Sequence, residues 1–128
     1  MTITIDGTTG IASVDGSAGS PSVRGSDANS GIVYSADNVA FSTGGTSRFA
    51  INSSGHVLPS ANNTYDLGSA SYAWKDIYTN DLNLSNKGHA NDVDGTWGSY
   101  TIQEGENDLF LLNKRNGKKY KFNLTEVS

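Results

Sequence analysis

The sequence predicts a mainly β protein made of short strands and hairpins, with little core of its own in a single chain. Only 35% of the 128 residues are hydrophobic, and 15 are glycine. Low hydrophobicity is typical of disordered chains, but the net charge of −4 is too small to drive expansion, and β-branched and aromatic residues recur throughout. This balance favours an extended, β-rich protein in which association with other copies supplies the missing core.

Residues 1–58 are expected to form a first β region. Its clearest strand patterns are the runs GIVYS, VAFST and SRFAINSS, which are separated by Asp37-Asn38 and by Gly44-Gly45. Both pairs are typical of hairpin turns. A shorter run, His56-Val57-Leu58, ends at Pro59. The region fits either a loose sandwich or an interdigitated β-prism in which three chains share one thin core.

Residues 59–98 read as a connector that contains one short helix, at about residues 69–79. Ser69 or Ser71 suits the N-cap of this helix, and Trp74, Ile77 and Tyr78 follow at i, i+3 and i+4. A helix of two to three turns is marginal alone, so its apolar stripe has to dock on a sheet or on neighbouring chains. Leu82 and Leu84 alternate with polar residues and predict a strand, and a polar loop follows over 87–95.

Residues 99–128 predict a three-stranded antiparallel meander. Glu104-Gly105-Glu106-Asn107 has glycine where a type II′ turn prefers it, and Asn116-Gly117 suits a type I′ turn. These turns place Ile102 opposite Leu109, and Leu111 opposite Phe122. The register gathers Tyr100, Ile102, Leu109, Leu111, Tyr120, Phe122 and Leu124 on one face, and leaves Phe110 and Leu112 on the other.

One three-stranded sheet cannot bury both of its faces, so the meander needs partners. The large apolar residues of the connector and of the meander are therefore the candidates for a core within the chain or between chains. They are Trp74, Ile77, Tyr78, Tyr100, Ile102, Leu109, Phe110, Leu111, Leu112, Phe122 and Leu124.

Three segments carry a resemblance to a known class of protein. Residues 63–71 (NTYDLGSAS), followed by residues 74–78 (WKDIY), resemble a segment common near the C-terminal end of tail fibres of tailed bacteriophages. Residues 41–55 are similar to segments that recur in fibre shafts. Gly95-Thr96-Trp97, together with residues 109–124, resembles the tip of some fibres from phages of aquatic bacteria, cyanophages among them.

This resemblance implies an elongated, homotrimeric virion fibre that recognises a receptor on the host cell surface, either a glycan or a protein. Residues 1–58 would then attach to a tail or baseplate protein and build the shaft, and residues 99–128 would form the tip. The fibre would be made in the host cytoplasm without a signal peptide, since MTITIDGTTG lacks a basic segment followed by an apolar one. Many fibres with these motifs continue into a self-cleaving chaperone domain, whereas this sequence ends after the meander, so autoproteolytic maturation is not expected.

Five of the nine basic residues crowd around the second hairpin of the meander. A solvated, charged hairpin tip is the simplest interpretation, and a tip that faces an acidic surface polysaccharide is the alternative. Aromatic rings and cationic groups suit sugars and anionic glycans. The candidates for receptor contact are Trp97, Lys114, Arg115, Lys118, Lys119 and Tyr120.

No pattern of an enzyme, cofactor or metal site is found, and we expect none of the three. The sequence has no cysteine, and Asp92 and Asp94 do not fit a calcium loop, because Ala90 and Thr101 stand where ligands are needed. His56 and His89 are isolated, although one histidine from each of three chains would suffice for a metal ion on a trimer axis. Nucleic-acid binding is disfavoured by the acidic composition, and no run is long enough for membrane insertion.

Two other functions stay open at the level of sequence. One is a fragment of a polysaccharide-degrading tailspike, which the fibre resemblance and the 13 acidic residues motivate. The other is a virion spacer or decoration protein without affinity for a receptor.

Overall fold

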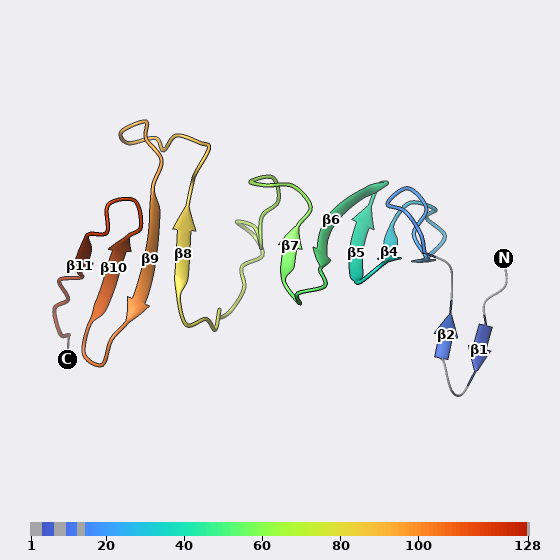
Figure 1. The fold of residues 1–128 in the computed structure, drawn as a ribbon, viewed down its shortest axis with the longest axis horizontal. Helices are drawn as coiled ribbons and strands as arrows, with labels where there is room; N and C mark the ends of the chain where they lie inside the picture. Colours follow the sequence, from blue (N-terminus) through green and yellow to red (C-terminus); the bar gives the residue numbers. More distant parts are fainter. Residues whose placement is uncertain (1–3, 7–9, 13–14, 128) are drawn as a thin grey trace. The chain divides into compact units, whose positions relative to one another are not determined.

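The computed structural model describes residues 4–6, 10–12 and 15–127, and this part of the chain is all β, with no helix (Figure 1). The predicted mainly β class is confirmed. The chain forms two compact units, residues 1–73 and 74–128. The predicted divisions at 58/59 and 98/99 stay a prediction, and the parts of the first region at residues 1–3, 7–9 and 13–14 lie outside the described residues. No described segment offers a helix long and apolar enough to cross a bilayer.

The first unit contains a five-stranded antiparallel sheet in which each strand pairs with its neighbour in sequence. Its strands are β3 (Val23–Arg24), β4 (Gly31–Ser35), β5 (Asn38–Thr43), β6 (Thr46–Ile51) and β7 (Val57–Pro59). A separate hairpin consists of β1 (Thr4–Asp6) and β2 (Gly10–Ala12). The four strand runs predicted between residues 31 and 58 are confirmed as β4 to β7.

The hairpin turns of this sheet follow from residues that tolerate a left-handed backbone. Gly44 and Gly45, with φ of 58° and 74°, form the two-residue loop between β5 and β6, as the Gly-Gly pair predicts. Between β4 and β5 the loop is Ala36-Asp37, not Asp37-Asn38, and Ser35 pairs with Asn38. Asp37 supplies the positive φ, at 53°. This offset moves each partner by two residues and therefore leaves the two faces unchanged.

The two faces of the five-stranded sheet differ sharply. One face holds the buried residues Val33, Ala40 and Ser42. On the other face Phe41 and Phe49 stack with their ring centroids 4.6 Å apart. The strand pairing defines this second surface, which we call the apolar face of the five-stranded sheet: Val23, Ile32, Tyr34, Val39, Phe41, Phe49, Ile51, Val57 and Pro59.

The second unit contains a four-stranded antiparallel sheet in the order β11–β10–β9–β8 (Figure 1). Its strands are β8 (Leu82–Ser85), β9 (Ser99–Glu104), β10 (Leu109–Asn113) and β11 (Lys119–Lys121). The predicted meander is confirmed as β9 to β11. The predicted strand at Leu82 and Leu84 is β8, and it extends the meander by pairing with the outer edge of β9.

Both turns of the meander differ from the predicted types. Ile102 pairs with Leu111, and Leu111 pairs with Tyr120, so each register is offset by two residues. Neither Gly105 nor Asn116 has the positive φ that the predicted turns require, whereas Gly117 has a φ of 73°. The second hairpin therefore closes through a four-residue loop that ends at Gly117. Because the offset is even, the predicted faces survive.

Each face of this sheet combines residues of the predicted meander with residues of β8. The apolar face of the four-stranded sheet gains two leucines from β8, and its members are Leu82, Leu84, Tyr100, Ile102, Leu109, Leu111 and Tyr120. On the opposite face Phe110 and Leu112 are half-buried beside Thr101, which is 1% exposed and donates to Asn83 Oδ1 at 2.8 Å. Phe122 and Leu124 follow the end of β11, and Leu124 is exposed.

The short helix predicted at about residues 69–79 is wrong. Ser69 and Tyr72 instead exchange two backbone hydrogen bonds of 2.9 and 3.2 Å, and Ser69 Oγ also accepts from the Tyr72 N–H at 3.1 Å. The serine therefore closes a tight turn rather than capping a helix. Downstream, Trp74, Ile77 and Tyr78 are all mostly exposed. A two-turn helix gains too little from its own hydrogen bonds to form without a surface that buries its stripe.

Candidate functional site

Two of the predicted receptor-contact residues meet in the second unit. The guanidinium carbon of Arg115 lies 4.1 Å from the centroid of the Trp97 ring, which is a cation–π contact. The Nη1 atom of Arg115 also donates to the Trp97 carbonyl oxygen at 2.6 Å. Trp97 comes just before β9, and Arg115 belongs to the loop between β10 and β11. The pair is therefore held by both a ring contact and a hydrogen bond.

The loop that carries Arg115 is fixed by its own side chains. Asn113 Oδ1 accepts from the Arg115 N–H at 2.9 Å, and the Asn113 carbonyl accepts from the Gly117 N–H at 2.9 Å. Asn116 Oδ1 accepts from the Lys118 N–H at 2.9 Å. Asparagine is well suited to such turns because its side chain bonds to the backbone two residues later. The loop geometry thus presents Arg115 in one orientation.

The loop that carries Trp97, residues 86–98, is organised around Asn91 and Asp94. Asp94 Oδ1 accepts from Asn91 Nδ2 at 2.6 Å, from the Thr96 N–H at 2.9 Å and from Thr96 Oγ1 at 2.8 Å. Asn86 Oδ1 accepts from the Gly98 N–H at 2.6 Å. These bonds order an exposed polar loop that has no regular secondary structure.

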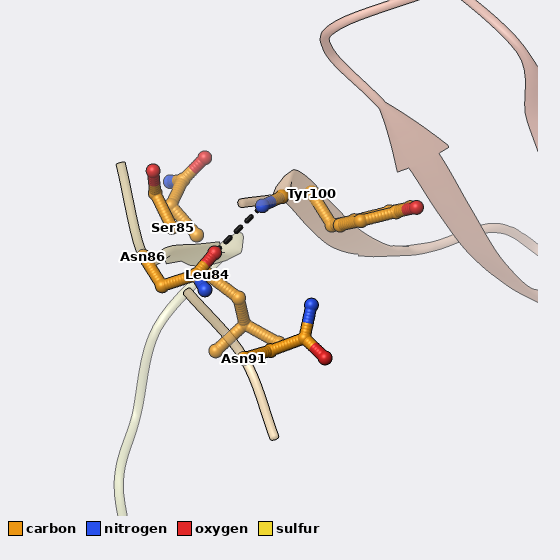
Figure 2. Close-up of a pocket in the computed structure, with 7 residues that line it drawn as sticks. Leu84, Ser85, Asn86, Asn91 and Tyr100 are labelled. Carbon is orange, nitrogen blue, oxygen red and sulfur yellow. Dashed lines mark hydrogen bonds between the residues drawn. The ribbon is translucent and has the colours of Figure 1, made fainter. Parts of the chain in front are cut away.

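These two loops border a shallow hollow of about 430 Å³. Its lining is polar and aromatic: Asn91, Asp94, Thr96, Trp97, Gly98, Tyr100, Asn113, Arg115 and Asn116. We call it the Trp97–Arg115 site. A second hollow of about 620 Å³ lies toward β8, and Figure 2 shows Leu84, Ser85, Asn86 and Asn91 around it, with the ring of Tyr100 extending away from them. The Tyr100 hydroxyl accepts from Asn113 Nδ2 at 3.0 Å.

The hydrogen bonds that Asp94 accepts lower the pKa of its carboxyl group below the usual value. The largest cause is the Thr96 N–H, followed by the side chains of Asn91 and Thr96. A pKa that is lower in the folded loop than in the unfolded chain stabilises the loop at pH values above the unfolded pKa. This stabilisation is lost as the pH falls through the folded pKa.

We therefore expect the Thr96 amide resonance to titrate with a midpoint below pH 3.8, the ordinary value for an aspartate. An NMR titration of the amide between about pH 2 and 7 measures this midpoint, and the range brackets ordinary aspartate titration. The variant Asp94→Ala should remove the transition. A midpoint at or above 3.8 would contradict the hydrogen-bonded geometry of this loop.

The other residues predicted to contact a receptor, and the neighbouring Lys121, do not line this site. Lys114 Nζ donates to Asn83 Oδ1 on β8 at 2.7 Å, and Lys118 and Lys119 are exposed. Lys121, at the end of β11, pairs with Asp108 at 2.7 Å. Tyr120 lies on the apolar face of the four-stranded sheet, opposite Leu111.

Sequence reasoning missed the polar half of the site. Asp94 was considered only as a calcium ligand, and Thr96 and Asn116 were not considered for this role. The spacing of Asn91, Asp94 and Thr96 is a signal for consecutive side-chain-to-backbone turns, and it was available in the sequence. Among the described residues, no group of three or more histidine, cysteine or acidic side chains is arranged to hold a metal ion.

Comparison with known proteins gives no relative from which a role for the site could be transferred. No protein-family model, no curated protein and no solved structure matches the chain. The function therefore has to be argued from the sequence motifs and from the geometry described above.

Proposed function

We propose that this chain is a structural tail-fibre protein of a bacteriophage, which assembles as an elongated homotrimer and attaches the virion to the host cell surface. In this proposal residues 1–58 bind a tail or baseplate protein, and the Trp97–Arg115 site faces the receptor. The observation that carries the proposal is the apolar surface that a single chain leaves uncovered.

The character of the uncovered surface favours further copies of the same chain as its cover. On the apolar face of the five-stranded sheet, large side chains remain uncovered: Val23, Tyr34, Phe49, Ile51 and Val57 are each at least 40% exposed. The apolar sheet of another copy suits such a face, because sheets pack face to face at about 10 Å through interdigitated side chains.

A groove beside β7 continues this uncovered surface. It has a volume of about 840 Å³ and is lined by Arg48, Phe49, Val57, Pro59, Thr64, Tyr65, Asp66 and Leu67. Arg48 is already engaged, since its Nε donates to Thr43 Oγ1 at 2.7 Å and its guanidinium lies 5.4 Å from the centroid of the Tyr65 ring. The free wall of the groove is thus mainly apolar, as expected for a contact between chains.

The apolar residues of the connector and the meander, which were predicted to form a core within or between chains, fit the same proposal. In the single chain, the apolar side chains of the meander are mostly half-buried, and Trp74, Ile77 and Tyr78 remain mostly exposed. A large exposed apolar surface on a soluble protein usually marks an interaction site. Burial of these residues between chains stays a prediction.

The adhesive function is tested by the binding of labelled protein to intact bacterial cells, with a panel that includes cyanobacteria. We expect staining that is restricted to particular strains, and we expect unlabelled protein to compete with it. If no strain is stained, the spacer or decoration function replaces the adhesive one. If incubation shortens the surface polysaccharide of a stained strain, the chain is a depolymerase fragment instead.

A further inference from the structure

We propose that the Trp97–Arg115 site binds a carboxylate-bearing sugar, that is, one residue of an acidic saccharide. The inference rests on the proposed adhesive function for its biological meaning, but the geometry of the site supports the ligand class by itself. Three features carry the argument: a guanidinium without an acidic partner, a group of oxygen and amide side chains, and an indole ring at the border of the same hollow.

The guanidinium of Arg115 is free to bind an anion. No described carboxylate lies within ion-pair distance of it, and its only described side-chain hydrogen bond goes from Nη1 to the Trp97 carbonyl. Its remaining N–H groups point to no described partner. Because the Trp97 ring and this bond fix its plane, the group loses little entropy on binding a carboxylate through two parallel hydrogen bonds.

The rest of the hollow suits hydroxyl groups rather than a second anion. Asp94 Oδ1 is saturated by Asn91 and Thr96, whereas its Oδ2 atom accepts no described hydrogen bond. Oδ2 is therefore available to a donor such as a sugar hydroxyl. The Asn116 amide borders the same hollow and offers both a donor and an acceptor. A second negative group near Asp94 would be repelled.

This combination separates the candidate ligands. A neutral sugar satisfies Asp94 and Asn116 but leaves Arg115 without a counter-charge. A free phosphate pairs with Arg115, but it brings more negative charge close to Asp94 and has no C–H surface. A sugar that carries a carboxylate supplies an anion, several hydroxyl donors and a C–H surface for the part of Trp97 that remains exposed beside Arg115, and so it satisfies all three features.

The test is isothermal titration calorimetry of the full chain with oligogalacturonate, and with maltohexaose as the neutral control. We expect oligogalacturonate to bind and to weaken as salt rises, since exposed charge pairs are screened. We expect maltohexaose to bind at least tenfold more weakly. Equal binding of the two probes, or no binding of oligogalacturonate, would overturn the inference.

Two variants assign the binding to this site. Arg115→Gln keeps a polar side chain in the loop and should weaken oligogalacturonate binding tenfold or more. Lys87→Gln removes an exposed charge that does not line the hollow, and it should leave binding within about twofold. Circular dichroism checks that both variants fold like the parent. If Arg115→Gln binds as well as the parent, the inference is wrong.

Failure of this inference is distinguishable from failure of the proposed function. Strain-specific cell staining without oligogalacturonate binding would reject the proposed ligand class. It would still support the adhesive fibre function. Oligogalacturonate binding that depends on Arg115, in a protein that stains no cell, would keep the site and remove the adhesive role.

Discussion

Replacing Ile51 by aspartate should convert the assembled protein into single chains. Ile51 lies on the apolar face of the five-stranded sheet, between Val39 on β5 and Val57 on β7, and 41% of its surface is exposed in one chain. If another copy covers this face, Ile51→Asp places an unpaired carboxylate inside the interface. Burial of an unpaired charge costs several kcal/mol, and each 1.4 kcal/mol weakens association about tenfold.

A matched variant separates loss of assembly from loss of folding. Ser54→Asp introduces the same residue into the turn that follows β6, at an exposed polar position outside the strands that form this face. It should keep the assembled mass and the circular dichroism spectrum of the parent. Light scattering coupled to size exclusion measures all three proteins. If Ile51→Asp retains the assembled mass, the apolar face of the five-stranded sheet is not an interface.

The second large effect is expected at Gly31, the first residue of β4. A Cβ at this position would collide with the Val23 carbonyl oxygen, and would lie 3.0 Å from Pro21 Cβ and 3.1 Å from Arg24 Cβ. Two of these contacts come from the backbone and ring of the adjoining segment, which cannot rotate away. Gly31→Ala should therefore disrupt the pairing of β3 with β4 and cost about 1–3 kcal/mol of stability.

Gly25 provides the control for this prediction. It lies in the segment between β3 and β4, has no positive φ, and a Cβ there meets no atom within 4 Å. Gly25→Ala should change stability by less than about 0.5 kcal/mol. Thermal unfolding followed by circular dichroism compares the two variants. Equal melting temperatures for Gly31→Ala and the parent would contradict the described packing around β3.

Much of the fold could be predicted because its strands carry local signals. The Gly44-Gly45 pair located one hairpin loop correctly, and the alternation of apolar residues located β4 to β6 and β8 to β10. The turns at Gly105 and Asn116 were misjudged because a residue that tolerates positive φ need not adopt it. The faces survived this error, since both offsets were of two residues.

The helix at about residues 69–79 failed for a different physical reason. The spacing of Trp74, Ile77 and Tyr78 is helical, but periodicity specifies a helix only where a surface buries the stripe. Ser69 suits both the N-cap of a helix and a tight turn. In the structure its hydrogen bonds with Tyr72 close a turn.

Only part of the candidate site could be predicted from the sequence. Trp97 and Arg115 were selected for their chemistry, but they are separated by two strands, and only the folded meander brings them to 4.1 Å. The accompanying role of Asp94 depends on which of its oxygen atoms the loop occupies, and that is a property of geometry rather than of composition.

The central claim is that copies of this chain cover one another's apolar faces, and the mass of the folded protein in solution tests it most directly. Light scattering on the purified full chain, at a concentration where circular dichroism shows an all-β fold, should give three times the chain mass of 13.5 kDa. A folded, monodisperse species with the mass of one chain would contradict the account.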